Sequence, residues 1–271
     1  MACTKDGAAM NVLAFDIETV PDVDGGRKLL SLGAELSDSD VAEAMFAKRR
    51  EKTGNDFIAT HLQRVVAISA VYRNSHKDQF SVWTIGKEDS SESDIVQNFF
   101  DGIDKHTPTL VTWNGSGFDL PVLHYRALIH GVQASRYWEL GEDDTNFRWN
   151  NYIGRFHLRH TDLMDVLAGY NNRAFAPLDE IAVLLGLPGK MGMSGAHVWS
   201  QYKAGEIKAI RDYCETDALN TYLVYLHWQA MRGQLDAAGL KAEQEVVRSA
   251  LRDGEPHLKA FLEAWENGSV D

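Results

Sequence analysis

The order of its secondary-structure signals constrains this chain more than any other feature. Three short runs rich in β-branched and aromatic residues predict strands, and a helix, a fourth strand and a second helix follow them. The predicted elements lie at 11–16, 64–72, 79–85, 91–105, 109–113 and 119–129. Because a polar turn separates the second and third strands, we expect these two strands to form a hairpin. The order of this part of the chain is therefore βββαβα.

The second half of the chain reads as mainly helical. We expect a short strand entering a helix at 161–168 and a helix at 178–185, then one long helix at 205–231 and helical structure over 235–265 that is interrupted at Gly239 and at 254–256. Two polar segments, 20–63 and 132–160, lack a clear period, although 40–52 is helical in pattern. Since there is no internal repeat or low-complexity linker, we expect a single domain over 1–271, with these two segments as insertions and a helical C-terminal extension from about 235.

Composition excludes several classes of protein. Of the 271 residues, 44% are hydrophobic, which is enough for a sizeable core, but apolar runs such as 65–72 are far shorter than the roughly 20 residues of a membrane-spanning helix. Residues 1–10 contain no apolar block, so we expect no secretory signal and a cytoplasmic location. Nothing indicates that Cys3 and Cys214 pair. The formal net charge of −12 argues against a protein that coats nucleic acid.

The first candidate site is the segment Asp-Ile-Glu at 16–18. Alternate residues of a strand face the same side, so Asp16 and Glu18 would share one face and Ile17 would lie on the other. Two adjacent carboxylates beside an apolar core are unfavourable unless a cation compensates, and a hard divalent ion such as Mg²⁺ or Mn²⁺ suits them. Alternatively, both acids lie in a loop, where water solvates them.

The second candidate site is the segment Asn-Gly-Ser-Gly-Phe-Asp at 114–119, directly after the fourth predicted strand. Its glycines permit a tight backbone path, and Asp119 would lie at the edge of the sheet where open sheets bind ligands. Alternatively, Asp119 is only the N-cap of the following helix. A dinucleotide-binding loop does not fit, because Leu120 stands where that motif needs Gly or Ala.

The third candidate site lies in the long predicted helix. Tyr213 and Asp217 are four residues apart, so the phenol and the carboxylate can converge on one point. A pair of this kind is also common as a simple hydrogen bond on a helix surface.

The three segments occur in the order of the three exonuclease motifs. The chain resembles a 3′→5′ exonuclease of the DEDD superfamily with tyrosine in the third motif. It is similar to the proofreading exonuclease domain of family-B DNA polymerases and to predicted stand-alone bacterial nucleases related to it. The resemblance covers 13–225 apart from 20–63. The subgroup with histidine in the third motif would place it at Asp212, so the tyrosine subgroup fits.

This resemblance implies an α/β ribonuclease H-like fold, with a mixed sheet of about five strands flanked by helices. It implies that Asp16, Glu18, Asp119 and Asp217 hold two Mg²⁺ or Mn²⁺ ions and that Tyr213 orients the attacking water. The implied reaction is hydrolysis of the terminal phosphodiester bonds of single-stranded or frayed DNA, which releases nucleoside 5′-monophosphates.

Further residues are candidates for holding the substrate. Ile17, Asn114 and Phe118 belong to the motif segments, and Lys190 lies in a loop that resembles a lysine-bearing loop of these nucleases. The aromatic and arginine residues of 149–159 could stack on bases or could equally form a packed insertion. Lys190 could equally be an ordinary exposed lysine. Asp162 is expected to cap the following helix, although it could also support the site.

Two other functions stay open at this point. Four carboxylates that face two divalent ions are locally neutral, so a protein of charge −12 can still hold a few nucleotides at a 3′ end. The substrate could be RNA, because nothing in the chain predicts how a 2′ hydroxyl would be read. The fold could also serve as a non-catalytic nucleic-acid or protein binding module. The rest of the chain is too short for a polymerase, so we expect any polymerase or repair partner to act in trans, and we expect no contact with a membrane.

Overall fold

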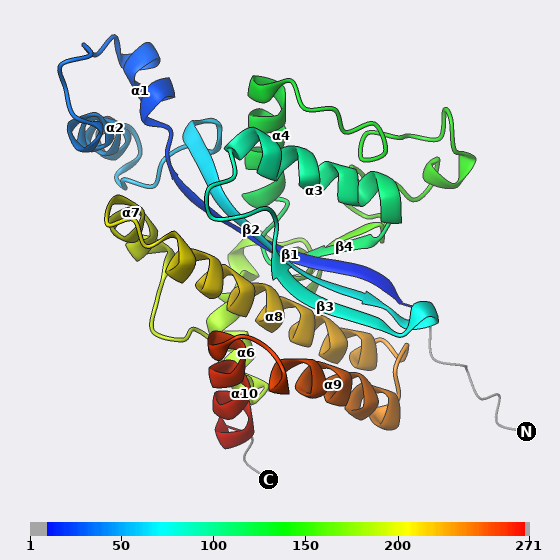
Figure 1. Ribbon diagram of the computed structural model, residues 1–271. Coiled ribbons are helices and arrows are strands. Elements are labelled where there is room, and N and C mark those ends of the chain that lie inside the picture. Colours follow the sequence, from blue (N-terminus) through cyan, green and yellow to red (C-terminus); the bar gives the residue numbers. More distant parts are fainter. Residues whose placement is uncertain (1–9, 269–271) are drawn as a thin grey trace, which may run out of the picture.

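A five-stranded sheet in the order β3-β2-β1-β4-β5 forms the centre of the molecule, a computed structural model that describes residues 10–268 (Figure 1). The strands are β1 (Asn11–Pro21), β2 (Gln63–Asn74), β3 (Gln79–Thr84), β4 (Thr109–Thr112) and β5 (His160–Asp162). β1, β2 and β3 pair antiparallel, whereas β4 runs parallel to β1 and β5 parallel to β4. The predicted hairpin and the mixed α/β sheet are both confirmed.

The central strand β1 is covered on both faces. Leu13, Phe15 and Ile17 pack into one apolar core, and Val12 and Ala14 pack into another on the opposite face. Burial on both faces explains the nearly continuous apolar sequence of this strand. The strand is also longer than its apolar run predicts, because pairing with β2 continues beyond the acids to Pro21.

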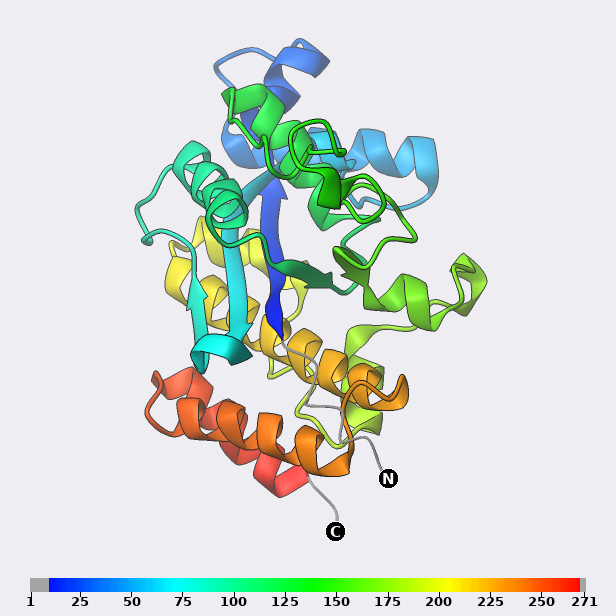
Figure 2. The ribbon, with the colours of Figure 1, turned by 90° about the vertical axis from the view of Figure 1, so that its right-hand side faces the viewer.

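The helices form layers on the two faces of the sheet (Figure 2). α3 and α4 contact β2 on one face, and α8 crosses the other face with α9 and α10 packed outside it. The helices are α1 (Val23–Leu30), α2 (Asp38–Thr53), α3 (Glu92–His106), α4 (Asp119–His130), α5 (Leu163–Leu167), α6 (Leu178–Leu184), α7 (Gly195–Lys203), α8 (Ile207–Met231), α9 (Ala237–Arg252) and α10 (Pro256–Gly268). Among the described residues, none of these helices has the length and apolar character needed to cross a membrane.

Two sequence predictions about the helices are wrong. The long helix does not begin at Gly205, because that residue has a φ of +79° and separates α7 from α8. Gly239 does not interrupt the C-terminal helices. It lies in the first turn of α9, where its N–H donates to the side chain of Asp236. In addition, α1 and α7 were not predicted, because they have only eight and nine residues and α1 contains two adjacent glycines.

The segment 132–160 is mainly irregular, and three of its six aromatic residues, Tyr137, Phe147 and Tyr152, are buried. The rings of Tyr137 and Tyr152 stack with their centroids 5.5 Å apart, and the guanidinium of Arg159 lies 3.9 Å from the ring centroid of Phe147. Trp149 and Phe156 are 83% and 72% exposed, so the segment is partly a packed insertion and its role in stacking stays a prediction. Cys214 is a free buried thiol, whereas Cys3 lies outside the described residues.

Candidate active site

The first motif lies within β1. Asp16 and Glu18 are two residues apart on the face that α8 covers, and Glu18 is 7% exposed. The alternative that both acids lie in a loop is therefore wrong. The pairing of β1 with β2 is irregular directly after Glu18, where Thr19 pairs with Val65 and one residue of β2 is skipped. Bulges of this type often occur beside active sites, because they redirect the neighbouring side chains.

The second motif is a tight loop between β4 and α4. Asn114 has a φ of +66°, and its carbonyl accepts hydrogen bonds of 3.0 Å from the N–H groups of Gly117 and Phe118. A Cβ atom on Gly115 would collide with the side chain of Thr112, so only glycine fits there. Phe118, not Asp119, is the N-cap residue of α4 and Asp119 is its first residue, so the capping alternative for Asp119 is wrong.

Asp162 holds this loop from the neighbouring strand. Its carboxylate accepts hydrogen bonds of 2.9 Å from the N–H of Asn114 and from the N–H of Ser116. It also caps α5 as predicted, through a longer contact of 3.4 Å to the N–H of Asp165. The stronger contacts are thus to the motif loop, which makes Asp162 a supporting residue of the site as well as a helix cap.

The third motif lies on α8. Tyr213 and Asp217 are both buried, at 7% and 8% exposure, and burial raises the pKa of Asp217 although a hydrogen bond from Tyr213 opposes this rise. Burial, and then the charge of Asp217, raises the pKa of Tyr213 far above its usual range. This phenol therefore stays protonated at neutral pH and acts as a hydrogen-bond donor rather than as a base.

The acids of the three motifs act on one another electrostatically, although among the described residues the group with ligand atoms within 4.8 Å of one another contains only Asp16, Glu18 and Cys214. Burial, then the charges of Asp119, Glu18 and Asp217, raises the pKa of Asp16 well above its usual range. Burial, then the charges of Asp217 and Asp119, does the same to the pKa of Glu18. Burial raises the pKa of Asp119 to about 7 and that of Asp217 to about 6. Residues up to two hundred positions apart in the sequence thus act on one another electrostatically.

The chemistry of this cluster fits hard divalent cations. Like charges held together in a buried position are unfavourable without a compensating cation, and carboxylate oxygens are the ligands that Mg²⁺ and Mn²⁺ prefer. The positive charge of Lys190 partly opposes the rise in the pKa of Glu18 and of Asp217. One lysine, however, does not balance the charge of four carboxylates.

A thiol that the sequence did not predict adjoins the cluster. One ligand atom each of Asp16, Glu18 and Cys214 lies within 4.8 Å of the others. The sulfur of Cys214 is 3.3 Å from the carbonyl oxygen of Asp16 and 3.6 Å from its carboxylate oxygen Oδ2. Burial raises the pKa of this thiol well above its usual range, so it donates to Asp16 rather than acting as a thiolate ligand.

A cleft of about 740 Å³ leads to the cluster at Glu18. Three of the four predicted substrate contacts, Ile17, Phe118 and Lys190, line this cleft, although Ile17 is 4% exposed and belongs mainly to the core. Asn114 lines a separate cavity of about 370 Å³. Other residues of the cleft wall come from segments to which the sequence assigned no role: Phe46, Arg50, Phe57, Ile58 and Trp199.

Buried carboxylates beside a cleft on a mixed sheet are typical of nucleases that use metal ions to cleave phosphodiesters. Residues 55–265 match the family described as predicted 3′-5′ exonucleases related to the exonuclease domain of PolB, and the chain belongs to this family. The acids of β1 precede the matched residues, so their part in the site rests on the geometry.

The curated proteins that are similar in sequence to this chain are consistent with membership of this family. The DNA polymerase epsilon catalytic chain from Aspergillus fumigatus is 24% identical over 222 residues, which are 80% of this chain and 9% of that protein. The Emericella nidulans protein has the same values, and the Saccharomyces cerevisiae protein is 22% identical over the same shares. The chain thus spans about a tenth of the length of these curated relatives.

Proposed function

We propose that this protein is a metal-dependent 3′→5′ exonuclease that removes nucleoside 5′-monophosphates from single-stranded or frayed DNA ends. The observation that carries the proposal is the convergence of Asp16, Glu18, Asp119 and Asp217 beside Tyr213 and an open cleft, in a chain of an exonuclease family. That the relatives are catalytic chains of a DNA polymerase favours DNA over RNA as the substrate.

The four carboxylates would hold two Mg²⁺ or Mn²⁺ ions. When bound, such a pair supplies a hydroxide nucleophile at neutral pH and stabilises the charge on the phosphate and on the leaving 3′ oxygen. Tyr213 remains protonated, and we assign to its hydroxyl the positioning of the attacking water next to Asp217. Cys214 holds the carboxylate of Asp16 in place.

The substrate contacts follow from the cleft. Phe118 presents a ring on which the terminal base can stack, and Ile17 supports the wall beside it. Lys190 lines the cleft and is exposed, and we assign to it a contact with a backbone phosphate. Asn114 contributes indirectly, because its backbone carbonyl fixes the loop that carries Phe118.

The decisive experiment uses a 5′-labelled single-stranded DNA oligomer with Mg²⁺ or Mn²⁺. The wild-type protein is expected to produce a ladder shortened one nucleotide at a time from the 3′ end, and Asp217→Ala is expected to produce none. Asp212→Ala is a matched control on the same helix, since the side chain of Asp212 is 28% exposed and pairs with Lys208 and His257 outside the acidic cluster. No ladder from the wild-type protein in either metal would refute the proposal.

The same assay separates the alternatives. Faster digestion of a matched RNA oligomer would identify an exoribonuclease. Stoichiometric binding without turnover would identify a binding module. We also propose that the chain is one domain in which 20–63 and 132–160 are insertions and the helices from about 235 are an extension. A cytoplasmic location and a polymerase or repair partner in trans stay predictions.

A further inference from the structure

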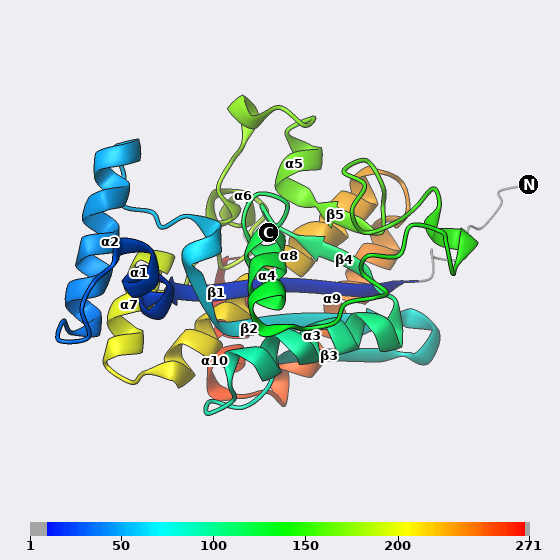
Figure 3. The ribbon, with the colours of Figure 1, turned by 90° about the horizontal axis from the view of Figure 1, so that it is seen from above.

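The insertion between β1 and β2, residues 22–62, forms an arm at the end of the sheet that also carries α7 (Figures 1 and 3). It contains α1 and α2 and has an apolar core of its own. The buried members of this core are Val23, Val41, Ala42, Met45 and Ile58. Trp199 of α7 packs against this core, so the arm is also attached to the body of the protein. The arm is thus a folded element with a definite position.

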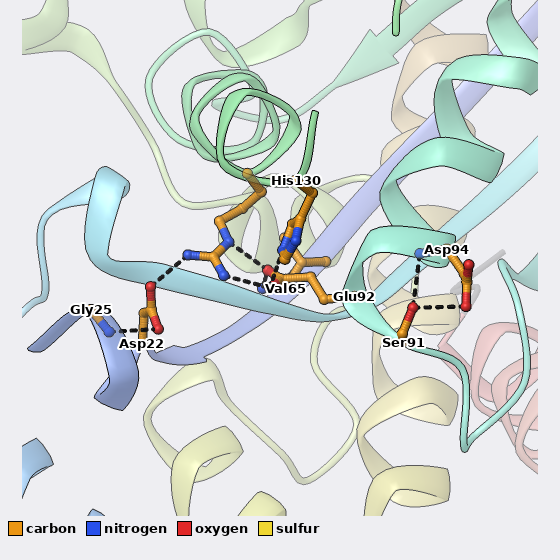
Figure 4. A network of polar contacts seen from close by, with 8 residues as sticks. Asp22, Gly25, Val65, Ser91, Glu92, Asp94 and His130 are labelled. Carbon is orange, nitrogen blue, oxygen red and sulfur yellow. Dashed lines mark hydrogen bonds and ion pairs between the residues drawn. The ribbon is translucent and has the colours of Figure 1, made fainter. Parts of the chain in front are cut away.

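The base of the arm is fixed by hydrogen bonds (Figure 4). The N–H of Asp22 donates to the carbonyl of Leu62 over 2.8 Å, which joins the two ends of the arm. The carboxylate of Asp22 accepts from the N–H of Gly25 and pairs over 2.7 Å with Arg126, which is 4% exposed. Arg126 is held in turn by Glu92 at the start of α3. Buried, charge-assisted contacts of this kind position the arm relative to the catalytic sheet.

One aromatic residue of the arm is exposed at the cleft although its backbone is held in place. The side chain of Phe57 is 58% exposed, and its ring centroid lies 5.4 Å from that of Phe118. Its N–H donates to Asn55 over 3.1 Å, and its carbonyl accepts from Arg49 over 2.9 Å. A phenyl ring that is exposed yet fixed in this way is a preformed surface on which a base can stack.

The same part of the arm concentrates positive charge in an acidic protein. The sequence Lys-Arg-Arg-Glu-Lys at 48–52 places four cations and one acid in the last turns of α2, whereas the whole chain has a net charge of −12. Lys48, Arg50 and Lys52 are exposed, and among residues 10–268 no ion pair or side-chain hydrogen bond involves the two lysines. Arg50 faces the cleft and has only a long, exposed contact of 3.5 Å with Asp56.

We propose that the arm binds the single-stranded DNA upstream of the nucleotide that is removed. Phe57, next to Phe118, stacks on a base, and the basic end of α2 contacts the backbone phosphates. The inference rests on the proposed function for the position of the 3′ end. Its physical reason is that the acidic cluster repels a polyanion, so the cations that hold the strand have to lie outside the cluster. Arg50 and Phe57 of the arm line the cleft that reaches Glu18, and Lys48 and Lys52 line an adjacent cavity of about 260 Å³ on the arm.

The test measures binding without turnover. The anisotropy of a fluorescein-labelled 12-nucleotide oligothymidylate is followed in EDTA over a range of salt concentrations. The control for Arg50→Gln is Arg252→Gln, which makes the same charge change at an exposed arginine of α9, far from the arm (Figures 1 and 2). We expect the arm variant alone to lose affinity and to lower the slope of log K against log salt by about 0.7, the value for one phosphate contact.

The aromatic contact has a separate test. Phe57→Ala is expected to weaken binding about 5- to 150-fold, the range of one base–aromatic stack, whereas Phe57→Tyr retains it. Thermal unfolding of each variant checks that the arm is folded, and the tyrosine variant keeps the test valid if the alanine variant is unstable.

The outcomes separate the arm from the enzyme activity. If the arm variants bind the oligomer as the control does, or if the wild-type protein does not bind it at all, the inference is wrong. If the arm variants lose binding but the wild-type protein yields no ladder with Mg²⁺ or Mn²⁺, the arm is a DNA-binding surface and the proposed function fails instead.

Discussion

Replacing Asp119 by asparagine is expected to stabilise the metal-free protein. The carboxyl of Asp119 is 4% exposed, and burial raises its pKa from 3.8 to about 7. The pKa of this carboxyl is higher in the folded state than in the unfolded state. Its contribution to the stability of the folded state is therefore fully present below pH 3.8 and is lost as the pH rises through about 7. At pH 8 the buried charge therefore opposes folding. Asparagine keeps the size and an acceptor oxygen but carries no charge.

The pKa shift gives the expected magnitude. The pKa of Asp119 is raised by roughly 3, and a difference of 1 in pKa corresponds to about 1.4 kcal/mol. Asp119→Asn is therefore expected to raise the free energy of unfolding by about 4 kcal/mol at pH 8. The same calculation gives about 2 kcal/mol at pH 5, because the wild-type carboxyl is then mostly protonated in the folded state. The gain thus falls as the pH falls.

Urea denaturation followed by tryptophan fluorescence measures these free energies in EDTA at pH 8 and pH 5. Asp212→Asn is the control, since the side chain of Asp212 is 28% exposed and lies outside the acidic cluster. The reasoning is refuted if Asp119→Asn is less stable than the wild-type protein at pH 8, or if its gain is equal at the two pH values.

Adding Mn²⁺ is expected to reduce the stability advantage of Asp119→Asn over the wild-type protein. A ligand that binds only the folded state stabilises it by about 2.7 kcal/mol at one hundred times its Kd. The wild-type protein should receive this gain, and Asp119→Asn should receive much less because one ligand oxygen is no longer anionic. An equal gain in the two proteins would mean that Asp119 does not contribute to a metal site.

Three further predictions concern the tyrosine, the metal affinity and the base of the arm. Tyr213→Phe should lower kcat about 100-fold, because the attacking water is no longer positioned, and should leave the Mn²⁺ affinity measured by calorimetry unchanged. Loss of that affinity would make Tyr213 part of the metal site. Calorimetry should also show Mn²⁺ affinity rising with pH through about 6 to 7, where Asp217 and Asp119 lose their protons, and a flat profile would contradict the pKa values. Arg126→Met leaves Glu92 buried without its guanidinium and should cost about 3–5 kcal/mol in urea denaturation, whereas a loss under 1 kcal/mol would show that this network does not hold the arm.

The sequence by itself predicted the order of the strands and of most helices through local patterns: the apolar runs of the strands and the helical spacing of α3 and α8. The mixed sheet and the four acids were implied by the resemblance of three short motifs, in their order along the chain, to an exonuclease family. Local spacing also placed Asp16 and Glu18 on one face of β1. The pattern could not locate the end of β1 or the first residue of α8, because strand pairing and a left-handed glycine at 205 decide those boundaries.

Only the tertiary structure decided what surrounds the acids. Cys214 meets Asp16 across 198 positions, Asp162 meets the motif loop across 48, and Phe57 reaches the ring of Phe118 from an insertion whose own sequence has no motif. Such contacts depend on how the strands and helices pack, and no short-range pattern encodes them. Burial, which sets the pKa values of the carboxylates, is likewise a property of the whole fold. Short segments of the sequence therefore specify which chemical groups the site contains. Their protonation and the shape of the cleft depend on how the whole chain packs.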